Sequence, residues 1–357
     1  MLEPGQPTSM RIALLFVGTL LALLAAEGVA RWLWELRPPA TVAARAAAPD
    51  TTGLPADWES LPDLRRVRDL DRPNLRAMNA GAFYRTNSMG FRGPEVSREP
   101  APGVFRVVVA GDSITMGQGV AEADTYPARL GDLLREEGRG LAVEVLNLGL
   151  SGTNVHSVAG RIERIGVPRH PDLIVYGFTV NDIKGPDYVA DTRPAEAQAR
   201  RDEHLRFADS ASYLLRSVWP RWLTLRDLVL RPPGSLGHEI HHNFFENPPA
   251  WEHFAAGLDR LAAIGEREGV CVHVLIHTFV AQLDWLHPFR DVYQRVADAA
   301  RERGLTVTET FEGFRGRDPL ELRVSFADPH PNARGHELLA RALHPALLAL
   351  PDACWEK

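Results

Sequence analysis

The chain has 357 residues, of which 45% are hydrophobic, enough to bury the core of one large domain or of two modest ones. Its formal net charge is −6, and because it carries no domain-wide basic excess to neutralise phosphates, we exclude a general nucleic-acid binder. The two cysteines, Cys271 in an apolar run and Cys354 near the C-terminus, exclude a disulfide framework and a cysteine-based metal site. We favour a buried thiol and an exposed one, and a single disulfide stays open for a domain outside the cytoplasm.

An apolar segment lies close to the N-terminus. Residues 12–26 are almost entirely apolar, a length typical of a secretory signal, and extension to the tryptophans at 32 and 34 gives the roughly 20 residues that a membrane-spanning helix needs. Glu27 then lies near the membrane edge. We favour an uncleaved signal anchor over residues 1–37, with a removed signal peptide as the alternative. The rest of the chain is then expected outside the cytoplasm, in the periplasm or at the cell surface.

Residues 38–83 are rich in Pro, Ala, Asp and Arg and lack sustained periodicity, so we interpret them as a spacer between the membrane and a folded domain. Residues 84–93 combine aromatic residues, polar residues and turn glycines. We expect this second segment to be ordered and packed near the domain, without assigning it to a helix or a strand.

Predicted strands alternate with predicted helices from residue 105 onward. Runs rich in β-branched residues predict strands at 105–110, 141–147, 172–178, 270–276 and 305–309, and amphipathic periodicity predicts helices at 125–137, 155–165, 251–268 and 289–303. An insertion at 185–249 interrupts the alternation with two helical pieces and a Pro/Gly-rich loop. The pattern predicts an α/β domain over residues 84–350, with a mainly parallel sheet covered by helices on both faces.

Residues with chemical function follow several of these strands. They are Asp112 and Ser113 after the first strand, Gly152 after the second, Asn181 and Asp182 after the third, and Asp328 and His330 before the final helix. Because the carboxyl ends of parallel strands meet at one edge of a sheet, we expect these residues to lie close together.

This set has the parts that acyl transfer needs. Serine is a weak nucleophile that requires a base, so His330 is the candidate to take the proton of Ser113 and to return it to the leaving group. Asp328 is the candidate to hold the imidazole tautomer and to stabilise the imidazolium.

The tetrahedral intermediate of such a reaction needs hydrogen-bond donors around its oxyanion. The backbone N–H groups of Ser113 and Gly152 and the side-chain amide of Asn181 are the candidates, and losing one such donor costs about 3–4 kcal/mol. We expect Asp112 to brace the turn that carries the serine and Asp182 to orient the loop after the third strand.

The four motifs resemble the sequence blocks of the SGNH (GDSL) hydrolase family, and the resemblance covers roughly residues 84–348. It implies a three-layer α/β/α, flavodoxin-like fold with a central, mostly parallel five-stranded sheet, and an esterase or carbohydrate O-deacetylase activity. It also implies that Ser113 is the nucleophile, that Gly152 and Asn181 complete the oxyanion hole, and that His330 is the base. Residues 86–93 resemble a membrane-anchored bacterial subgroup that is often linked to cell-surface polysaccharide.

Two positions depart from the family pattern. Thr179 stands where the family usually has glycine, two residues before the asparagine, and Asp328 lies two residues before His330 where three are common. If the shorter spacing does not bring Asp328 to the histidine, Glu321 or Asp318 is the alternative acid.

A zinc-protease pattern, H-E-x-x-H, occurs at residues 238–242. It lies between proline pairs with little apolar periodicity around it, so we interpret it as part of a polar loop or lid and expect no metal and no cofactor. The function we expect is a membrane-anchored serine ester hydrolase that acts on acyl esters, O-acetyl groups of cell-surface carbohydrate among them. The alternatives are an O-acyltransferase that modifies an extracellular polysaccharide and a noncatalytic glycan-binding factor.

Overall fold

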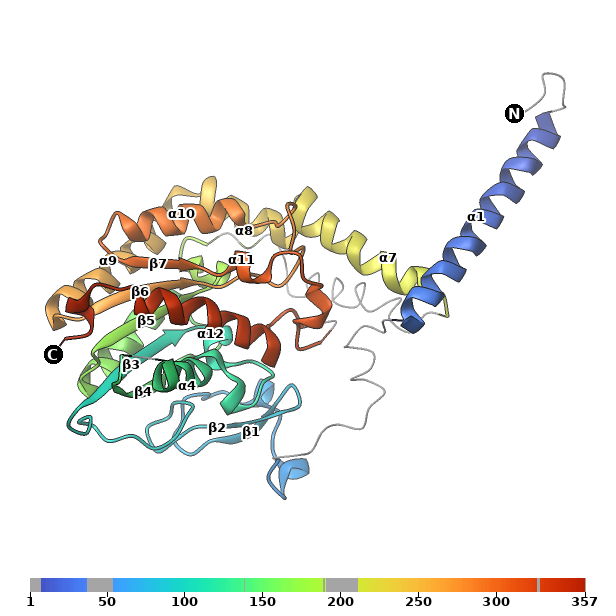
Figure 1. Cartoon of the computed structure of the whole chain (residues 1–357). Helices are drawn as coiled ribbons and strands as arrows, with labels where there is room; N and C mark the ends of the chain where they lie inside the picture. The colour runs from blue at the N-terminus through green and yellow to red at the C-terminus, as the bar shows by residue number, and fades with distance from the viewer. Residues whose placement is uncertain are drawn as a thin grey trace.

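A computed structural model describes residues 8–36, 54–137, 139–188, 190, 211–325 and 328–356 (Figure 1). The strands are β1 (Arg76–Asn79), β2 (Ala82–Arg85), β3 (Val104–Gly111), β4 (Ala142–Asn147), β5 (Leu173–Phe178), β6 (Cys271–Ile276) and β7 (Thr306–Glu309). The helices are α1 (Thr8–Leu36), α3 (Ser113–Met116), α4 (Tyr126–Glu137), α5 (Val155–Arg161), α7 (Tyr213–Thr224), α8 (Leu236–Phe245), α9 (Pro248–Glu268), α10 (Arg290–Arg301), α11 (Phe311–Phe314) and α12 (Ala333–Leu348).

The central sheet has five parallel strands in the order β4-β3-β5-β6-β7. Numbered along the chain, this is the order 2-1-3-4-5 of flavodoxin-like folds. The predicted α/β fold is confirmed, and each of the five strands expected from the sequence is present. The inner strand β5 is a continuous apolar run, Leu173–Phe178, because it is buried on both faces, whereas the edge strand β7 is half-buried and carries polar residues.

Helices cover both faces of this sheet (Figure 1). Val108 and Ala110 of β3 belong to one hydrophobic core with residues of α5, α9 and α10. Val107 and Val109 point to the opposite face and belong to a second core with residues of α4 and α12. Alternate residues of one strand therefore anchor the two helical layers.

An antiparallel hairpin of β1 and β2 precedes the first sheet strand. Its turn residues Ala80 and Gly81 both have positive φ angles, 48° and 91°, as the tight turns of hairpins require. Buried residues of this region form a small third core: Leu64, Leu75, Ala77, Tyr84 and Met116.

Our interpretation of residues 38–83 as a spacer differs from this part of the structure. Residues 54–83 pack against the domain, because Leu64, Leu75 and Ala77 bury their side chains beside Met116 of α3. These apolar residues are too widely spaced to produce a periodic pattern in the sequence. The rest of the expected spacer lies outside the described residues.

The insertion at 185–249 contains two helices among its described residues, α7 and α8, as the sequence predicts. Phe244 of α8 is fully buried and packs edge-on against Phe178 at the end of β5. The insertion is therefore anchored beside the carboxyl end of the sheet. Residues 191–210 of the insertion lie outside the described residues.

Cys271 and Cys354 form a disulfide, with their Cα atoms 5.5 Å apart. We had favoured two free thiols, and this interpretation was wrong. After α12 the chain turns back across the amino-terminal ends of the strands, where Trp355 stacks on Phe105 of β3 with ring centroids 4.8 Å apart. That return brings Cys354 to the start of β6, a contact across 83 residues that no local pattern indicates.

Helix α1 extends away from the α/β domain (Figure 1). Its segment Leu15–Leu33 is the one stretch among the described residues that is long and apolar enough to cross a membrane, and only 6% of it is buried. By length and composition it is a candidate anchor or signal segment.

Candidate active site

Ser113 occupies the first position of the short helix α3, directly after strand β3. The turn is tight, since a Cβ atom on Gly111 would lie 2.2 Å from Oγ1 of Thr115. Helix α3 ends at Gly117, whose φ of 85° suits glycine. This sharp strand-to-helix turn presents the serine at the carboxyl edge of the sheet, where ligands bind in open α/β folds.

His330 lies between Ser113 and Asp328. Its Nε2 is 2.8 Å from Oγ of Ser113, and its Nδ1 is 2.5 Å from Oδ1 of Asp328. The three side chains, from two chain segments 217 residues apart, thus form the continuous hydrogen-bonded series expected from the sequence. A serine proton can pass to Nε2 while the carboxylate holds the proton on Nδ1.

The short spacing between Asp328 and His330 is accommodated by a turn. Oδ1 of Asp328 accepts both the ring Nδ1–H and the backbone N–H of His330, the latter at 3.1 Å. The backbone N–H of Val324 donates to the His330 carbonyl at 2.8 Å and closes the loop. Burial alone would raise the pKa of Asp328, but its hydrogen bonds and the charge of His330 outweigh burial, and this pKa lies below its ordinary value.

The two alternative acids lie elsewhere. Glu321 pairs with Arg334 at 3.0 Å, and the Asp318 carboxylate accepts the backbone N–H of Leu320 at 2.9 Å. Asp328 is therefore the carboxylate that contacts His330.

The three candidate oxyanion donors converge on the Asp112 carboxylate. Its Oδ1 accepts the Gly152 N–H at 2.6 Å, its Oδ2 accepts the side-chain amide of Asn181, and the Ser113 backbone contributes a further hydrogen bond. We expected Asp112 only to brace the turn, whereas its buried carboxylate gathers the donors that an oxyanion needs. Burial raises the pKa of Asp112 although these donors oppose the rise.

Thr179 holds the Asn181 amide in this orientation. Its Oγ1 donates to Oδ1 of Asn181 at 2.6 Å, which leaves the Nδ2 group facing Asp112. Thr179 is the position where the SGNH pattern usually has glycine. The departure from the pattern therefore supplies a hydrogen bond to the motif asparagine.

Asp182 is fully buried beneath this loop. Its Oδ2 accepts the Tyr176 hydroxyl at 2.6 Å and the Thr179 N–H at 3.1 Å, so it orients the loop as we expected of it. Burial, with the nearby charge of Asp112, raises the pKa of Asp182 well above its ordinary value. The Thr179 hydroxyl lies 3.0 Å from Oδ1 of Asp182 and 2.6 Å from Oδ1 of Asn181, so both oxygens are acceptors for its single proton and the Asn181 contact is the shorter.

The comparison with protein families agrees with this geometry. The model of the GDSL-like lipase/acylhydrolase family matches residues 109–338, more than half of the chain. The chain belongs to this family. It is accordingly an ester-hydrolysing enzyme, and its SGNH resemblance is confirmed.

Similar solved structures include an acetylxylan esterase from Geobacillus stearothermophilus, with a TM-score of 0.43 and 17% identity over 69% of this chain and 95% of that one. Another is an alpha/beta hydrolase enzyme from the metagenome of Lake Arreo, Spain, with a TM-score of 0.42 and 20% identity over 68% of this chain and 94% of that one. A comparison with curated proteins finds no match.

Arg92 supports the turn that carries Ser113 in this GDSL-like hydrolase, and the sequence analysis does not single it out. Its guanidinium is buried and donates to the carbonyls of Met116 and Gly117 at 2.8 Å and of Val120 at 2.6 Å. Burial lowers the pKa of Arg92 to about 10. The sequence offered one signal for this role, because Arg92 lies in a segment that we expect to pack near the domain. Its partners could not be predicted, because the tertiary fold alone brings their backbone carbonyls to the guanidinium.

His336 of α12 stacks on Tyr126 of α4, with ring centroids 6.0 Å apart. It is fully buried, its Nδ1 accepts the Tyr126 N–H at 3.1 Å, and burial holds its pKa well below the ordinary value. Tyr126 in turn contacts Oγ1 of Thr115 at 2.9 Å. This neutral histidine therefore packs behind α3 and supports the turn that carries the nucleophile.

The H-E-x-x-H residues lie on α8 rather than in a polar loop. Glu239 accepts the Tyr188 hydroxyl at 2.5 Å, and His242 pairs with Glu246 at 3.2 Å. No group of three or more His, Cys, Asp or Glu side chains that could hold a metal ion occurs within the described part of the chain. The described contacts of this segment are those of a structural helix.

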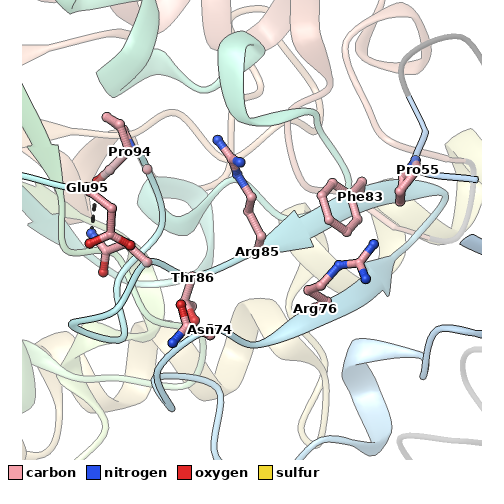
Figure 2. Close-up of a pocket in the computed structure, with 10 residues that line it drawn as sticks. Pro55, Asn74, Arg76, Phe83, Arg85, Thr86, Pro94 and Glu95 are labelled. Carbon is pink, nitrogen blue, oxygen red and sulfur yellow. Dashed lines mark hydrogen bonds between the residues drawn. The ribbon is translucent and has the colours of Figure 1, made fainter. Parts of the chain in front are cut away.

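A surface cavity of about 390 Å³ lies on the β1–β2 hairpin, apart from the serine. Figure 2 shows Phe83, Arg76 and Arg85 around it, and the carboxylate of Glu95 at one end. None of the triad or oxyanion residues lines this cavity. Its position excludes it as the place where an ester would meet Ser113.

Proposed function

We propose that this GDSL-like hydrolase is a membrane-anchored, extracytoplasmic serine esterase that acts through an acyl-enzyme on Ser113. The observation that carries the proposal is the series of contacts from Oγ of Ser113 through His330 to Asp328, at 2.8 Å and 2.5 Å. A serine in contact with an imidazole that a carboxylate orients is the arrangement that activates a hydroxyl for attack on an ester.

The reaction follows from the positions of these groups. Oγ of Ser113 attacks the acyl carbonyl carbon while Nε2 of His330 takes the proton. The intermediate collapses, His330 protonates the departing alcohol oxygen, and the acyl group stays on Ser113. A water molecule then attacks the acyl-enzyme with His330 again as base, which releases the acid and restores the serine.

In each tetrahedral intermediate, the oxyanion takes the place of the Asp112 carboxylate as the hydrogen-bond acceptor. It then accepts from the Gly152 N–H and from the Asn181 side-chain amide. The Gly152 N–H has a single proton, so it cannot serve both acceptors fully. A carboxylate beside a developing oxyanion is repelled, whereas a neutral carboxyl is not. Burial raises the pKa of Asp112, which is the direction that eases the approach of an oxyanion.

We place the site outside the cytoplasm for two reasons. The Cys271–Cys354 disulfide is typical of proteins in an oxidising compartment. The apolar segment Leu15–Leu33 is suited to anchor the chain in the membrane that bounds such a compartment.

We further propose that the substrate is an acyl ester, and in particular an O-acetyl group, on cell-surface carbohydrate. The resemblance of residues 86–93 to a membrane-anchored subgroup linked to polysaccharide supports this choice. Residues 1–37 would then form the anchor, and residues 84–350 the catalytic domain with its insertion at 185–249. The packed residues 54–83 would join that domain instead of the spacer.

The test uses the full chain with p-nitrophenyl acetate and with an O-acetylated polysaccharide. We expect release of p-nitrophenol and of acetate, and a loss of about 10⁴-fold or more in kcat for Ser113→Ala. Unchanged activity in Ser113→Ala would contradict the assignment. Transfer of the acetyl group to an added polysaccharide, at the expense of hydrolysis, would identify an O-acyltransferase instead.

A further inference from the structure

Helix α7 is joined to the apolar helix α1 through the Glu27 carboxylate. Glu27 accepts the Ser212 hydroxyl and the Tyr213 N–H, both at 2.6 Å, and the Leu214 N–H at 3.1 Å. The first N–H groups of a helix have no partner within it and carry partial positive charge, so a carboxylate there is a strong acceptor. Glu27 thus adds acceptors from a different helix to the start of α7, where the N-cap Ser212 itself accepts the Leu215 N–H at 3.2 Å.

One face of α7 exposes large apolar side chains. Leu215 is 40% exposed, Val218 52% and Trp222 45%. Their spacing of three and four residues places them in a row on one side of the helix. A row of exposed apolar side chains on an otherwise folded domain marks a surface that contacts an apolar environment.

The residues that flank this apolar row are basic. Arg216 and Arg221 lie at helical positions on either side of it. Arginine beside an apolar face is typical of helices that lie in the headgroup region of a bilayer, where it meets lipid phosphates. Tryptophan is likewise enriched at that depth.

The depth at which Glu27 contacts α7 agrees with a position of α7 in the headgroup region. Glu27 lies six residues before Leu33, the end of the apolar segment of α1. At 1.5 Å per residue this is about 9 Å inside the end of the segment, and in-plane amphipathic helices bury their apolar face about 5–10 Å deep. Figure 1 shows α7 leaving α1 near its C-terminal end and running toward the α/β domain.

We propose that α7 lies in the headgroup region of a phospholipid bilayer, with Leu215, Val218 and Trp222 directed toward the acyl chains and Glu27 as its fixed joint to α1. This inference rests on the proposed membrane anchor. Helix α7 continues into the π-helical segment η7 (Leu225–Leu230), which packs against α8. Helix α8 contacts the loop that carries Asn181, so the active site is held close to the membrane surface.

The experiment places a fluorescent label on the full chain reconstituted in phosphatidylcholine and phosphatidylglycerol vesicles. Because the two native cysteines are joined, Val218→Cys introduces the single reactive thiol. Glu266→Cys, on the exposed side of α9, is the matched control. Each label is quenched separately by nitroxide-labelled lipid and by aqueous iodide.

We expect lipid quenching to be several-fold stronger at Val218→Cys than at Glu266→Cys, and iodide quenching to show the reverse order. If vesicles retain the chain while iodide quenches both labels equally, the placement of α7 is wrong and the anchor stands. A label at 218 shielded from both quenchers would show that a protein surface, not lipid, covers this face. If mass spectrometry shows that residues 1–36 have been cleaved off and the chain is released from the vesicles, both the proposed membrane anchor and the proposed position of α7 are wrong.

A second comparison tests the joint itself. Glu27→Ala removes these acceptors, and we expect it to lower lipid quenching at position 218 while α1 stays in the membrane. Thr19→Ala is the control, since the Thr19 hydroxyl donates within α1 itself, to the Leu15 carbonyl at 2.8 Å. Equal quenching in the two variants would contradict the role of Glu27.

Discussion

Oγ1 of Thr179 donates a 2.6 Å hydrogen bond to Oδ1 of Asn181 and so fixes which side of the amide faces Asp112. A side-chain amide that is free to flip would present its oxygen to an oxyanion about as readily as its N–H group. The threonine therefore acts as a positioning residue for the proposed oxyanion hole.

Thr179→Val removes this hydrogen bond and keeps the side-chain volume. We expect kcat to fall about tenfold with little change in KM, because a whole oxyanion donor is worth about 3–4 kcal/mol and this variant only misorients one. Thr179→Ser retains the hydroxyl and serves as the control, with kcat close to the unsubstituted enzyme. Equal losses in both variants would show that Thr179 matters for packing and not for the amide.

The acid of the triad is tested by Asp328→Asn. The asparagine cannot stabilise the imidazolium or hold the productive tautomer of His330, and we expect kcat to fall by about 10⁴-fold. Glu321→Gln is the control, because Glu321 pairs with Arg334 at 3.0 Å and should leave kcat unchanged. A large effect of Glu321→Gln with a small effect of Asp328→Asn would reverse the assignment.

The buried Asp182 gives the stability of the fold a defined pH dependence. Its pKa is raised well above 3.8, so between that value and the raised pKa the folded chain holds a proton that the unfolded chain has lost. The contribution of Asp182 to the free energy of unfolding therefore decreases as pH rises through this interval, by at most about 1.4 kcal/mol per pH unit.

Asp182→Asn removes the titrating group and nearly keeps the side-chain volume. Relative to the unsubstituted chain, we expect its free energy of unfolding to improve as pH rises above 3.8 toward the raised pKa of Asp182, measured by chemical denaturation at a series of pH values. A difference between the two proteins that is constant across this range would show that Asp182 is ionised in the folded state.

The disulfide is expected to stabilise the domain because it closes a loop of 83 residues. Cys354→Ser should lower the free energy of unfolding by about 2–4 kcal/mol, measured by denaturation. Reduction of the unsubstituted chain should produce a loss of the same size. Identical stability with and without reductant would indicate that the bond does not form.

Local patterns were sufficient to predict the sheet and the contact between Ser113, His330 and Asp328. Each strand is a short β-branched run, and Ser113, Asn181 and His330 each stand beside an element boundary that the sequence marks. The contacts that were not predicted join segments distant along the chain, such as Cys271 with Cys354. Arg92 and Glu27 belong to the same class, since each binds backbone groups whose position only the tertiary fold determines.

Covalent trapping of the nucleophile tests the central claim most directly. The full chain is treated with a fluorophosphonate, and the modified residue is located by peptide mass spectrometry. We predict a single adduct on Ser113, formed much more slowly in His330→Ala because the serine has lost its base. An adduct on another residue, or an adduct on Ser113 that forms equally fast without His330, would contradict the proposed site.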